Sequence, residues 1–430
     1  RGCNSAFRWR LFWCSPPIVD SICSGSKIYQ LFILPRVACA PLAMLTTLLL
    51  LLSILPSNVQ AFMVVLGKYE EKAEILDDRN NIFEELFVGD KPEIVAVGFR
   101  WTEGPVWNFK DESLYFSDTV LDNIYRFDTK TNKISIFLYN SGGLDQESGE
   151  KQLLVETGSN GLIIDGNENE LIIMQHGGRG ISRMDMDLGF LVKFASTYPA
   201  NKGHKGHRLN SPNDGVIYHD VDHTKKKYLF FTDPPYGLIN VSQPHDHPDV
   251  DARSEINGSY VYSVDLERQN PNITVLKNNG NTTRPNGIDI TPDGEFAYIS
   301  NCCQGHDPYC PRGRGIWWKH KILHNESWEE FGHPTLANSH VPIIINFGRT
   351  SGCADGFKII PGLDDDDDDV PSSPMIIGSC PGGLCILDTR DWKLYEPLLA
   401  YLGMPERVSN VAVGGDGYLY ITGEGKLWRL

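Results

Sequence analysis

The amino-acid sequence predicts an all-β protein built as a six-bladed β-propeller. The chain of 430 residues contains 41 glycines and 26 prolines, a composition that favours many short strands joined by turns. One short motif returns six times along the chain, at intervals close to the length of a propeller blade. Hydrophobic residues make up 41% and charged residues 22% of the chain, as in ordinary globular proteins, which excludes a largely disordered chain.

Each copy of the motif begins with a polar or acidic residue, which we call the head residue. An apolar pair follows, in most copies after a glycine, and then come a turn and an aromatic-rich strand. Two β-sandwiches are the alternative fold, but they would not explain the regular return of one motif. The six head residues are Glu103, Asn160, Asn213, Asn286, Asp355 and Asn410.

Successive copies lie somewhat farther apart than the roughly 40 to 50 residues of a four-stranded blade, so we expect loop insertions. Little chain follows the sixth copy, and its blade needs one more strand. The strand-like segment Glu93–Val97 is expected to supply it and to close the ring. The domain prediction is therefore a single propeller over residues 62–430.

Residues 1–61 are predicted to be a leader. The first methionine is Met44, the segment Val37–Leu55 has no charged residue, and Val59-Gln60-Ala61 is a small-residue pattern suited to cleavage after Ala61. Translation from Met44 would make the apolar segment a signal peptide, which is the interpretation we favour. Translation from an upstream start would make residues 37–55 a signal anchor. Either alternative places the body in the secretory pathway, secreted or in its lumen.

Cysteines and sequons in the body fit that compartment. Six cysteines could form up to three disulfides of unspecified pairing, although some could instead be free buried thiols. Five Asn-x-Ser/Thr sequons make glycosylation of at least one asparagine an expectation. The cysteines are Cys302, Cys303, Cys310, Cys353, Cys380 and Cys385, and the sequons begin at Asn240, Asn257, Asn272, Asn281 and Asn325.

The net charge of −16 argues against a nucleic-acid partner, because such proteins carry a basic face. The aspartate run Asp364–Asp369 is expected to be a solvated loop. Membrane association is expected only if the leader stays attached as an anchor. The oligomeric state is not indicated.

Four head residues carry oxygen ligands: Glu103, Asn213, Asn286 and Asp355. The innermost strands of a propeller converge on a central channel, so residues at equivalent blade positions meet near one axis. Two carboxylates and two amide oxygens suit a central divalent cation, Ca²⁺ before Mg²⁺, Mn²⁺ or Zn²⁺.

Hairpin turns are the alternative explanation, because Asn-Gly and Asp-Gly pairs are common there. We expect such turns at Asp165-Gly166, Asp293-Gly294 and Asp416-Gly417, each of which lies between two strands of one repeat. The four ligand residues lie earlier, at the head position, and this shared register favours a metal site.

Eight segments along residues 100–430 resemble the senescence-marker-protein/gluconolactonase/luciferin-regenerating-enzyme-like family, and most closely its microbial gluconolactonase branch. The resemblance implies a six-bladed propeller with one divalent cation on its axis, in a family whose members mostly hydrolyse lactones. The segments are 101–107 (WTEGPVW), 176–179 (HGGR), 208–214 (RLNSPND), 232–237 (TDPPYG), 284–287 (RPNG), 355–358 (DGFK), 381–383 (PGG) and 409–412 (SNVA).

The resemblance also implies roles for individual residues. It implies metal ligation by Glu103, Asn286 and Asp355, with Asn213 either ligating or touching substrate through the metal shell. Asp355 would be the acid/base, and Asp214 would lie near the substrate. The sequence departs from the family pattern at Ala354, in the aspartate run after Pro361, and in a cysteine-rich insertion at Asn301–Arg314. The last two departures put the substrate more in doubt than the metal site.

Other residues of the matching segments are candidate substrate contacts. His176 and Arg179 could bind sugar hydroxyls, although a hydrogen-bonded histidine at a strand end is the favoured interpretation of His176. The aromatic residues Trp101, Trp107 and Phe231 are expected to pack within blades. Tyr236 is the exception, because it lies in a proline-bounded loop after a strand, where binding residues are common.

Together these features predict a metal-dependent, gluconolactonase-like hydrolase that acts on a small lactone. The metal would polarise the carbonyl group, and Asp355 would act as acid and base. A phosphotriesterase or arylesterase on the same site is one alternative. The other is a secreted propeller without catalytic activity that binds a protein or a glycan.

Overall fold

The protein is described from a computed structural model. The described residues are 73–78, 81–89, 91–144, 153–166, 169–197, 206–240, 254–256, 258–269, 271–278, 284–302, 313–324, 333–348, 350–362, 373–390 and 397–430. The predicted leader, the aspartate run, Cys303, Cys310 and the sequons at Asn257, Asn281 and Asn325 lie outside these ranges. Contacts divide the chain into two units, and every described residue belongs to the second, which comprises residues 34–40 and 64–430.

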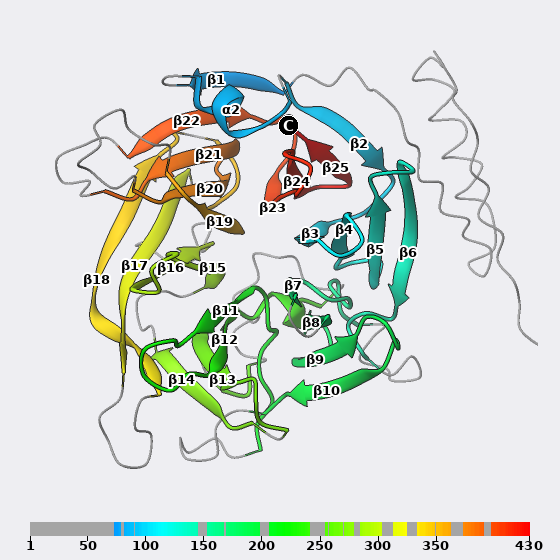
Figure 1. Ribbon diagram of the computed structural model, residues 1–430, viewed down its shortest axis with the longest axis vertical. Helices are drawn as coiled ribbons and strands as arrows, with labels where there is room; N and C mark the ends of the chain where they lie inside the picture. Colours follow the sequence, from blue (N-terminus) through cyan, green and yellow to red (C-terminus); the bar gives the residue numbers. More distant parts are fainter. Residues whose placement is uncertain are drawn as a thin grey trace, which may run out of the picture. The chain divides into compact units, whose positions relative to one another are not determined.

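Six antiparallel sheets form the six blades of a propeller, as the repeats predict (Figure 1). Blade 1 contains β3 (Thr102–Asn108), β4 (Ser113–Asp118), β5 (Asn123–Asp128) and β6 (Lys133–Tyr139). Blade 2 contains β7 (Leu162–Asp165), β8 (Glu170–Gln175), β9 (Gly180–Asp185) and β10 (Leu191–Ala195). Blade 3 contains β11 (Gly215–His219), β12 (Lys227–Asp233), β13 (Tyr260–Asp265) and β14 (Ile273–Asn278).

The last three blades follow the same order from the centre outward. Blade 4 contains β15 (Pro285–Ile290), β16 (Phe296–Asn301), β17 (Arg314–His324) and β18 (Pro334–Asn346). Blade 5 contains β19 (Phe357–Ile360), β20 (Met375–Cys380), β21 (Gly383–Asp388) and β22 (Leu398–Gly403), with β1 (Glu74–Asp78) on its outer edge. Blade 6 contains β23 (Val408–Val413), β24 (Leu419–Gly423), β25 (Lys426–Arg429) and β2 (Glu93–Val97). Two short helical segments complete the described elements, α2 (Ile82–Leu86) and η3 (Tyr236–Leu238).

The ring closes as predicted, because β2 from the start of the propeller pairs with β25 from its end. Blade 6 is thus built from both ends of the propeller, and Glu93 accepts a hydrogen bond from Arg429 across this pair. The innermost strands are β3, β7, β11, β15, β19 and β23, and each contacts the next around the ring (Figure 1). Two β-sandwiches are therefore excluded.

Turns and aromatic side chains follow the sequence pattern. The expected turns at Asp165, Asp293 and Asp416 each join the first two strands of a blade. Trp107 and Phe231 are buried, and Trp107 stacks on Tyr420 of the neighbouring blade with ring centroids 5.9 Å apart. Aromatic packing between blades therefore holds the sheets side by side, since stacked rings add to the gain from burial.

The structure decides between the alternatives left open for the four cysteines that it describes. Cys302 and Cys353 form a disulfide that joins the end of β16 in blade 4 to the loop before β19 in blade 5. Cys380 and Cys385 are free buried thiols on the paired strands β20 and β21, so they do not belong to a disulfide. Their burial in an apolar sheet explains this, because they occupy core positions as small hydrophobic side chains.

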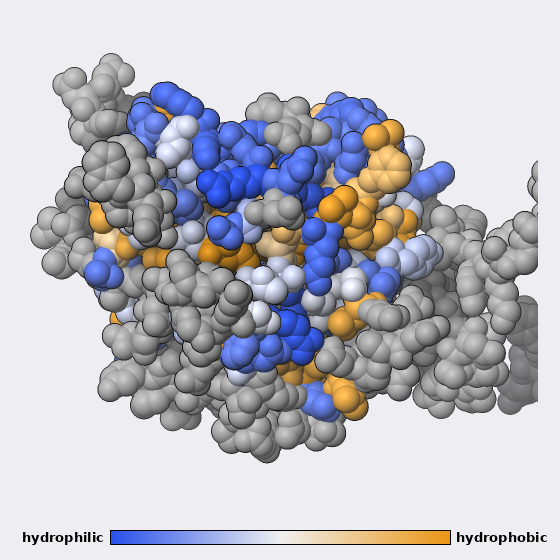
Figure 2. Space-filling model, turned by 90° about the horizontal axis from the view of Figure 1, so that it is seen from below, coloured by the Kyte–Doolittle hydropathy of each residue, from blue (hydrophilic) through white to orange (hydrophobic). Residues whose placement is uncertain are grey.

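The surface of the described propeller is mixed. On the face shown in Figure 2, hydrophobic residues form small groups among hydrophilic ones. Of the two described sequons, Asn272 is exposed, whereas Asn240 is half-buried. None of the helices in the described ranges is long and apolar enough to cross a membrane.

Candidate functional site

Hydrogen bonds between neighbouring blades position the head residues around the axis. The hydroxyl group of Ser117 in blade 1 donates to the carbonyl oxygen of Asn160 in blade 2 at 2.7 Å. Thr232 in blade 3 donates in the same way to Asn286 in blade 4 at 2.5 Å, and Ser300 in blade 4 donates to Asp355 in blade 5 at 2.6 Å. We call these three hydrogen bonds the blade latches, because each ties a head residue to the second strand of the preceding blade.

The backbone is irregular at two of the head positions. The pairing register shifts at Glu103 in β3 and around Asn286 in β15, as expected at bulges, which are common beside functional sites. Gly104 has a φ of 52°, and a Cβ atom there would lie 2.3 Å from the carbonyl oxygen of Asn160. Only glycine therefore fits immediately after Glu103.

Acidic side chains gather at this centre and repel one another. Glu103 and Asp355 are only 4% and 8% exposed. Burial raises the pKa of Glu103 well above its usual value, and the charges of Asp355, Asp214 and Glu156 raise it further, against a hydrogen bond from Trp101. We call Glu103, Glu156, Asp214 and Asp355 the acidic cluster.

Asp355 lies in the same buried, negatively charged surroundings as Glu103. Burial raises the pKa of its carboxyl group well above the usual value, the charges of Asp214 and Glu156 raise it further, and the backbone N–H of Gly356 and the charge of Arg407 lower it. Its Oδ1 atom is buried and accepts no hydrogen bond. A carboxylate in this state favours protonation or a cation over an isolated negative charge.

Asp214 is joined to the sixth blade. The Nδ2 atom of Asn410 donates to Asp214 Oδ2 at 3.3 Å, and a Cβ atom at Gly356 would lie 2.1 Å from Cγ of Asn410. Asp214 also accepts the N–H of Gly215 at 2.8 Å. Asn410 thus lies between two members of the acidic cluster, Asp214 and Asp355.

Tyr236 and the disulfide border the cluster. The hydroxyl group of Tyr236 donates to the carbonyl oxygen of Cys302, and its ring lies 5.7 Å from the guanidinium of Arg284. Burial raises the pKa of Tyr236, the charge of Arg284 lowers it, and the charges of Asp355 and Glu156 raise it. The predicted substrate contact therefore lies beside the cluster as a protonated hydroxyl donor.

His176 is fully buried and hydrogen-bonded at both ring nitrogens. Its Nδ1 atom lies 3.1 Å from the carbonyl oxygen of Pro212, and its Nε2 atom lies 3.0 Å from Glu156 Oε2. His176 thus reaches the acidic cluster through Glu156, and its ring nitrogens are already engaged in these bonds.

Arg179 contacts another part of the second and third blades. Its Nε atom donates to the carbonyl oxygens of Leu209 and Asn210, and its Nη1 atom donates to Glu255 at 2.8 Å. These contacts support the loop that leads to Asn213. They do not place the guanidinium group among the head residues.

Trp101 differs from the expectation that it packs within a blade. It is half-buried, its Nε1 atom donates to Glu103 Oε1 at 3.0 Å, and the guanidinium of Arg407 lies 4.8 Å from its ring. Arg407 also lines a cavity of about 360 Å³ together with Ser351, Gly382 and Glu406. Arg407 thus lines this cavity and also lowers the pKa of Asp355 through its charge.

The residues fit a hard divalent cation. The donor set consists of carboxylate and amide oxygens, and two buried oxygens at head positions, Asn160 Oδ1 and Asp355 Oδ1, accept no hydrogen bond. Buried oxygens without partners are costly, and a cation would satisfy them. Glu103, Asn213, Asn286 and Asp355 would hold it, and Asn160 adds an oxygen that the sequence prediction left out.

Glu156, Asn410 and Arg407 also join this site without having been assigned to it. Asn410 is a head residue, so the repeat register could have identified it. Glu156 lies in the connection before β7, outside the register, and only the folded ring brings it to the cluster.

Comparison with known proteins relates part of the chain to a known family. Residues 101–306 match the model of the SMP-30/Gluconolactonase/LRE-like region. A gluconolactonase of Zymomonas mobilis is 33% identical over 217 residues, which cover 50% of this chain and 53% of that protein. The match thus spans about half the length of this relative.

Solved structures support the fold. XC5397 from Xanthomonas campestris, a gluconolactonase, has a TM-score of 0.56 at 20% identity, covering 84% of this chain and 98% of its own. A structural-genomics target provisionally described as a gluconolactonase has a TM-score of 0.57 at 21% identity, covering 83% of this chain and 97% of its own. At these identities the likeness establishes the propeller fold.

Proposed function

Because the chain carries an SMP-30/gluconolactonase/LRE-like domain over residues 101–306, we propose that it is a metal-dependent hydrolase that opens a small lactone. The observation that carries the proposal is the buried acidic cluster on the propeller axis, in which Asp355 Oδ1 accepts no hydrogen bond. We further propose Ca²⁺ as the cation, since the oxygen donors are hard and uncharged amides share the site with carboxylates.

Asp355 has the properties of a general base. Its carboxyl pKa is raised by burial and by Asp214 and Glu156, which makes it a stronger base than a solvated aspartate. Asp355 takes a proton from a water molecule as the water oxygen bonds to the lactone carbonyl carbon. The ring C–O bond then breaks, and Asp355 returns the proton to the leaving oxygen, so that a hydroxy acid is formed.

The other residues orient the substrate and compensate charge. A bound divalent cation would polarise the carbonyl oxygen and offset its negative charge. Tyr236 presents its hydroxyl oxygen near Asp355, and Arg407 offers a positive charge to the acid that forms. Asn213 would bind the cation or contact the substrate, as the sequence indicates. His176 positions Glu156 through its 3.0 Å contact.

The test compares Asp355→Asn with Asp289→Asn on a panel of aldonolactones, aryl esters and phosphotriesters. Asp289 is a matched control, because it is a half-buried carboxylate on an inner strand that accepts the N–H of Ile359 at 2.7 Å. We expect Asp355→Asn to lower kcat on aldonolactones by about 10²- to 10⁴-fold, the usual contribution of a general acid–base. The kcat of Asp289→Asn should remain within about threefold of the wild-type kcat, a change well below the contribution of a general acid–base.

Turnover of phosphotriesters or aryl esters alone would instead support the esterase alternative. Absence of turnover on the whole panel by a folded, cation-loaded protein would favour a propeller that only binds its partner.

A further inference from the structure

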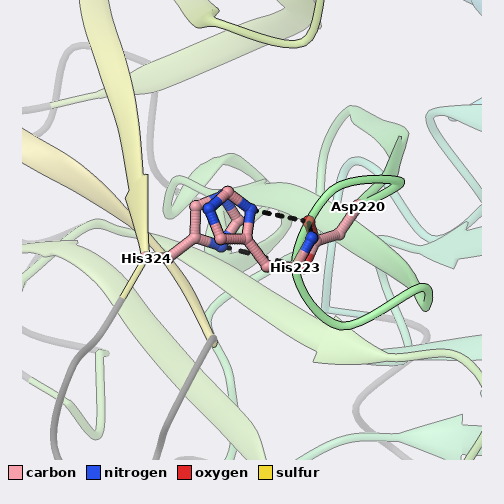
Figure 3. Close-up of side chains that lie close together, drawn as sticks. All are labelled: Asp220, His223 and His324. Atoms are coloured by element: carbon pink, nitrogen blue, oxygen red, sulfur yellow. Dashed lines mark hydrogen bonds and ion pairs between the residues drawn. The ribbon is translucent and has the colours of Figure 1, made fainter.

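A second cluster of metal-ligand side chains lies outside the acidic cluster, where blades 3 and 4 meet. Asp220 and His223 belong to the turn between β11 and β12, and His324 is the last residue of β17 (Figure 3). One ligand atom from each of the three lies within 4.8 Å of the other two. From this geometry we propose that Asp220, His223 and His324 form a zinc site that clamps blade 3 to blade 4.

The strand directions separate this site from the head residues. Asn213 precedes β11, whereas Asp220 follows its end. The strand β17 runs parallel to β15, because each is antiparallel to β16, so His324 lies at the same end as the final residue of β15. The three ligands therefore occupy the propeller face opposite the acidic cluster.

The distances suit a small cation with nitrogen and oxygen ligands. Asp220 Oδ1 lies 3.3 Å from His223 Nδ1, and Asp220 Oδ2 lies 3.7 Å from His324 Nδ1. Ligands at about 2.0 to 2.2 Å from a tetrahedral Zn²⁺ lie roughly 3.3 to 3.6 Å from one another. A set of two imidazoles and one carboxylate favours Zn²⁺ over Ca²⁺, which prefers oxygen ligands.

Asp220 is held in place by its own turn. Its side chain is only 1% exposed, and Oδ2 accepts hydrogen bonds from the backbone N–H of Thr224 at 2.8 Å and from its hydroxyl group at 2.5 Å. The carboxylate thus faces the two imidazoles in a fixed orientation, as a preorganised ligand requires.

His324 also has a partner at its other ring nitrogen. Its Nε2 atom lies 3.3 Å from the hydroxyl oxygen of Tyr218, while Nδ1 faces Asp220. Metal-bound histidines usually donate their second ring N–H to such an oxygen, which sets the tautomer whose other nitrogen binds the metal. Tyr218 is itself buried between the blades among residues that include Ile322.

His223 completes the site from the solvent side. Its ring stacks on that of His324 with centroids 3.5 Å apart, and its side chain is 51% exposed. Two imidazoles bound to one tetrahedral Zn²⁺ have their ring centroids farther apart than this, so the exposed ring of His223 would rotate out of the stack when the ion binds. The exposed side of His223 leaves room for water as a fourth ligand.

The test titrates Zn²⁺ into the full protein after chelation and saturation with Ca²⁺, so that the acidic cluster is filled. Calorimetry should show one equivalent of Zn²⁺ bound. His223→Ala and His324→Ala should each weaken the binding at least tenfold. His219→Ala is the matched control, because His219 is an exposed histidine at the end of β11, next to Asp220 but outside the cluster, and this variant should bind as the wild type does.

Thermal unfolding provides a second readout, of whether bound Zn²⁺ stabilises the contact between blades 3 and 4. Zn²⁺ should raise the Tm of the wild type and of His219→Ala but not that of His324→Ala, since a ligand that binds only the folded state stabilises it. Lactone hydrolysis by His324→Ala should equal that of the wild type. A failure of the zinc proposal can therefore be distinguished from a failure of the proposed lactonase activity. Absence of Zn²⁺ binding by the Ca²⁺-loaded wild type, or equal binding by His324→Ala, would overturn the zinc site.

Discussion

At the scale of single residues, Asp355 combines burial, an unpartnered Oδ1 atom and neighbouring negative charges. Each of these raises the free energy of its ionised form, and together they explain why the carboxyl group would bind a cation or a proton so readily. Glu156 contributes to this state from outside the repeat register, and it is held in place by His176 at 3.0 Å.

Glu156→Gln should move the acidic limb of the kcat/KM profile to lower pH. The charge of Glu156 raises the pKa of Asp355, so its removal lowers that pKa and keeps the base ionised in more acidic solution. The measurement is a pH profile of lactone hydrolysis, with Asp289→Asn as the control. An acidic limb at the same pH in wild type and Glu156→Gln would show that this charge does not reach Asp355.

The repeat register made the head residues predictable from sequence, because strands of equal position converge on one axis. The register assigns Glu103, Asn286 and Asp355 to the proposed ligand set, which stays a prediction. Asn160 and Asn410 share this register but were not included in that set. Glu156 could not be predicted from the register, because its place depends on the path of the connection before β7. The pairing of Cys302 with Cys353 was also beyond prediction, because spacing along the sequence does not show which cysteines lie close together in the fold.

At the scale of elements, the blade latches join strand packing to site geometry. Ser300 on β16 accepts the N–H of Gly287 at 2.7 Å and donates to the carbonyl oxygen of Asp355 at 2.6 Å. A single buried hydroxyl group thus links β15, β16 and the loop before β19. This arrangement explains how a base in blade 5 is positioned by blade 4.

Ser300→Ala should cost about 1 to 3 kcal/mol of unfolding free energy, because two buried backbone groups lose their partner. It should also lower kcat, since the backbone of Asp355 is released. The matched control is Ser263→Ala on β13, where a buried hydroxyl group has no hydrogen-bond partner and its loss should cost little. Denaturant unfolding and steady-state kinetics measure both effects, and equal stability of the two variants would contradict the latch.

Asp233 at the end of β12 gives the fold a pH dependence. Burial raises its pKa to about 7, although the N–H groups of Asn210 and Ser211 and the charge of Arg179 lower it. A carboxyl group whose pKa rises on folding stabilises the protein while it stays protonated, and that contribution is lost as the pH rises toward 7. The Asp233→Asn variant carries an uncharged side chain that resembles the protonated carboxyl group. Between pH 5 and pH 8 the Tm of this variant should therefore fall less than the Tm of the wild type. Parallel Tm curves would contradict this assignment.

At the scale of the whole molecule, the ring depends on a strand from its beginning. The strand β2 pairs with β25, and without it blade 6 would have only three strands and would lose its chain connection to β3 of blade 1. The sequence predicted this closure because the sixth motif leaves too little chain for a complete blade. The leader and the signal-peptide cleavage lie outside the described residues and stay predictions.

Removal of residues 1–98, which takes away β2, should therefore abolish cooperative unfolding. A protein that begins at residue 62, the predicted mature start, should unfold like the full chain and retain its activity. Calorimetric unfolding distinguishes the two. A cooperative transition after removal of β2 would show that the ring does not need this strand.

The central claim is that a divalent cation held by the acidic cluster supports lactone hydrolysis. The most direct measurement is aldonolactone hydrolysis by the wild type and by Glu103→Gln after exhaustive chelation, with Ca²⁺ then added back while its binding is followed by calorimetry. We predict that chelation abolishes wild-type activity, that one equivalent of Ca²⁺ restores it, and that Glu103→Gln binds Ca²⁺ at least tenfold more weakly and needs correspondingly more for activity. Full activity in the chelated wild type, or recovery of Glu103→Gln at the same Ca²⁺ concentration, would contradict the claim.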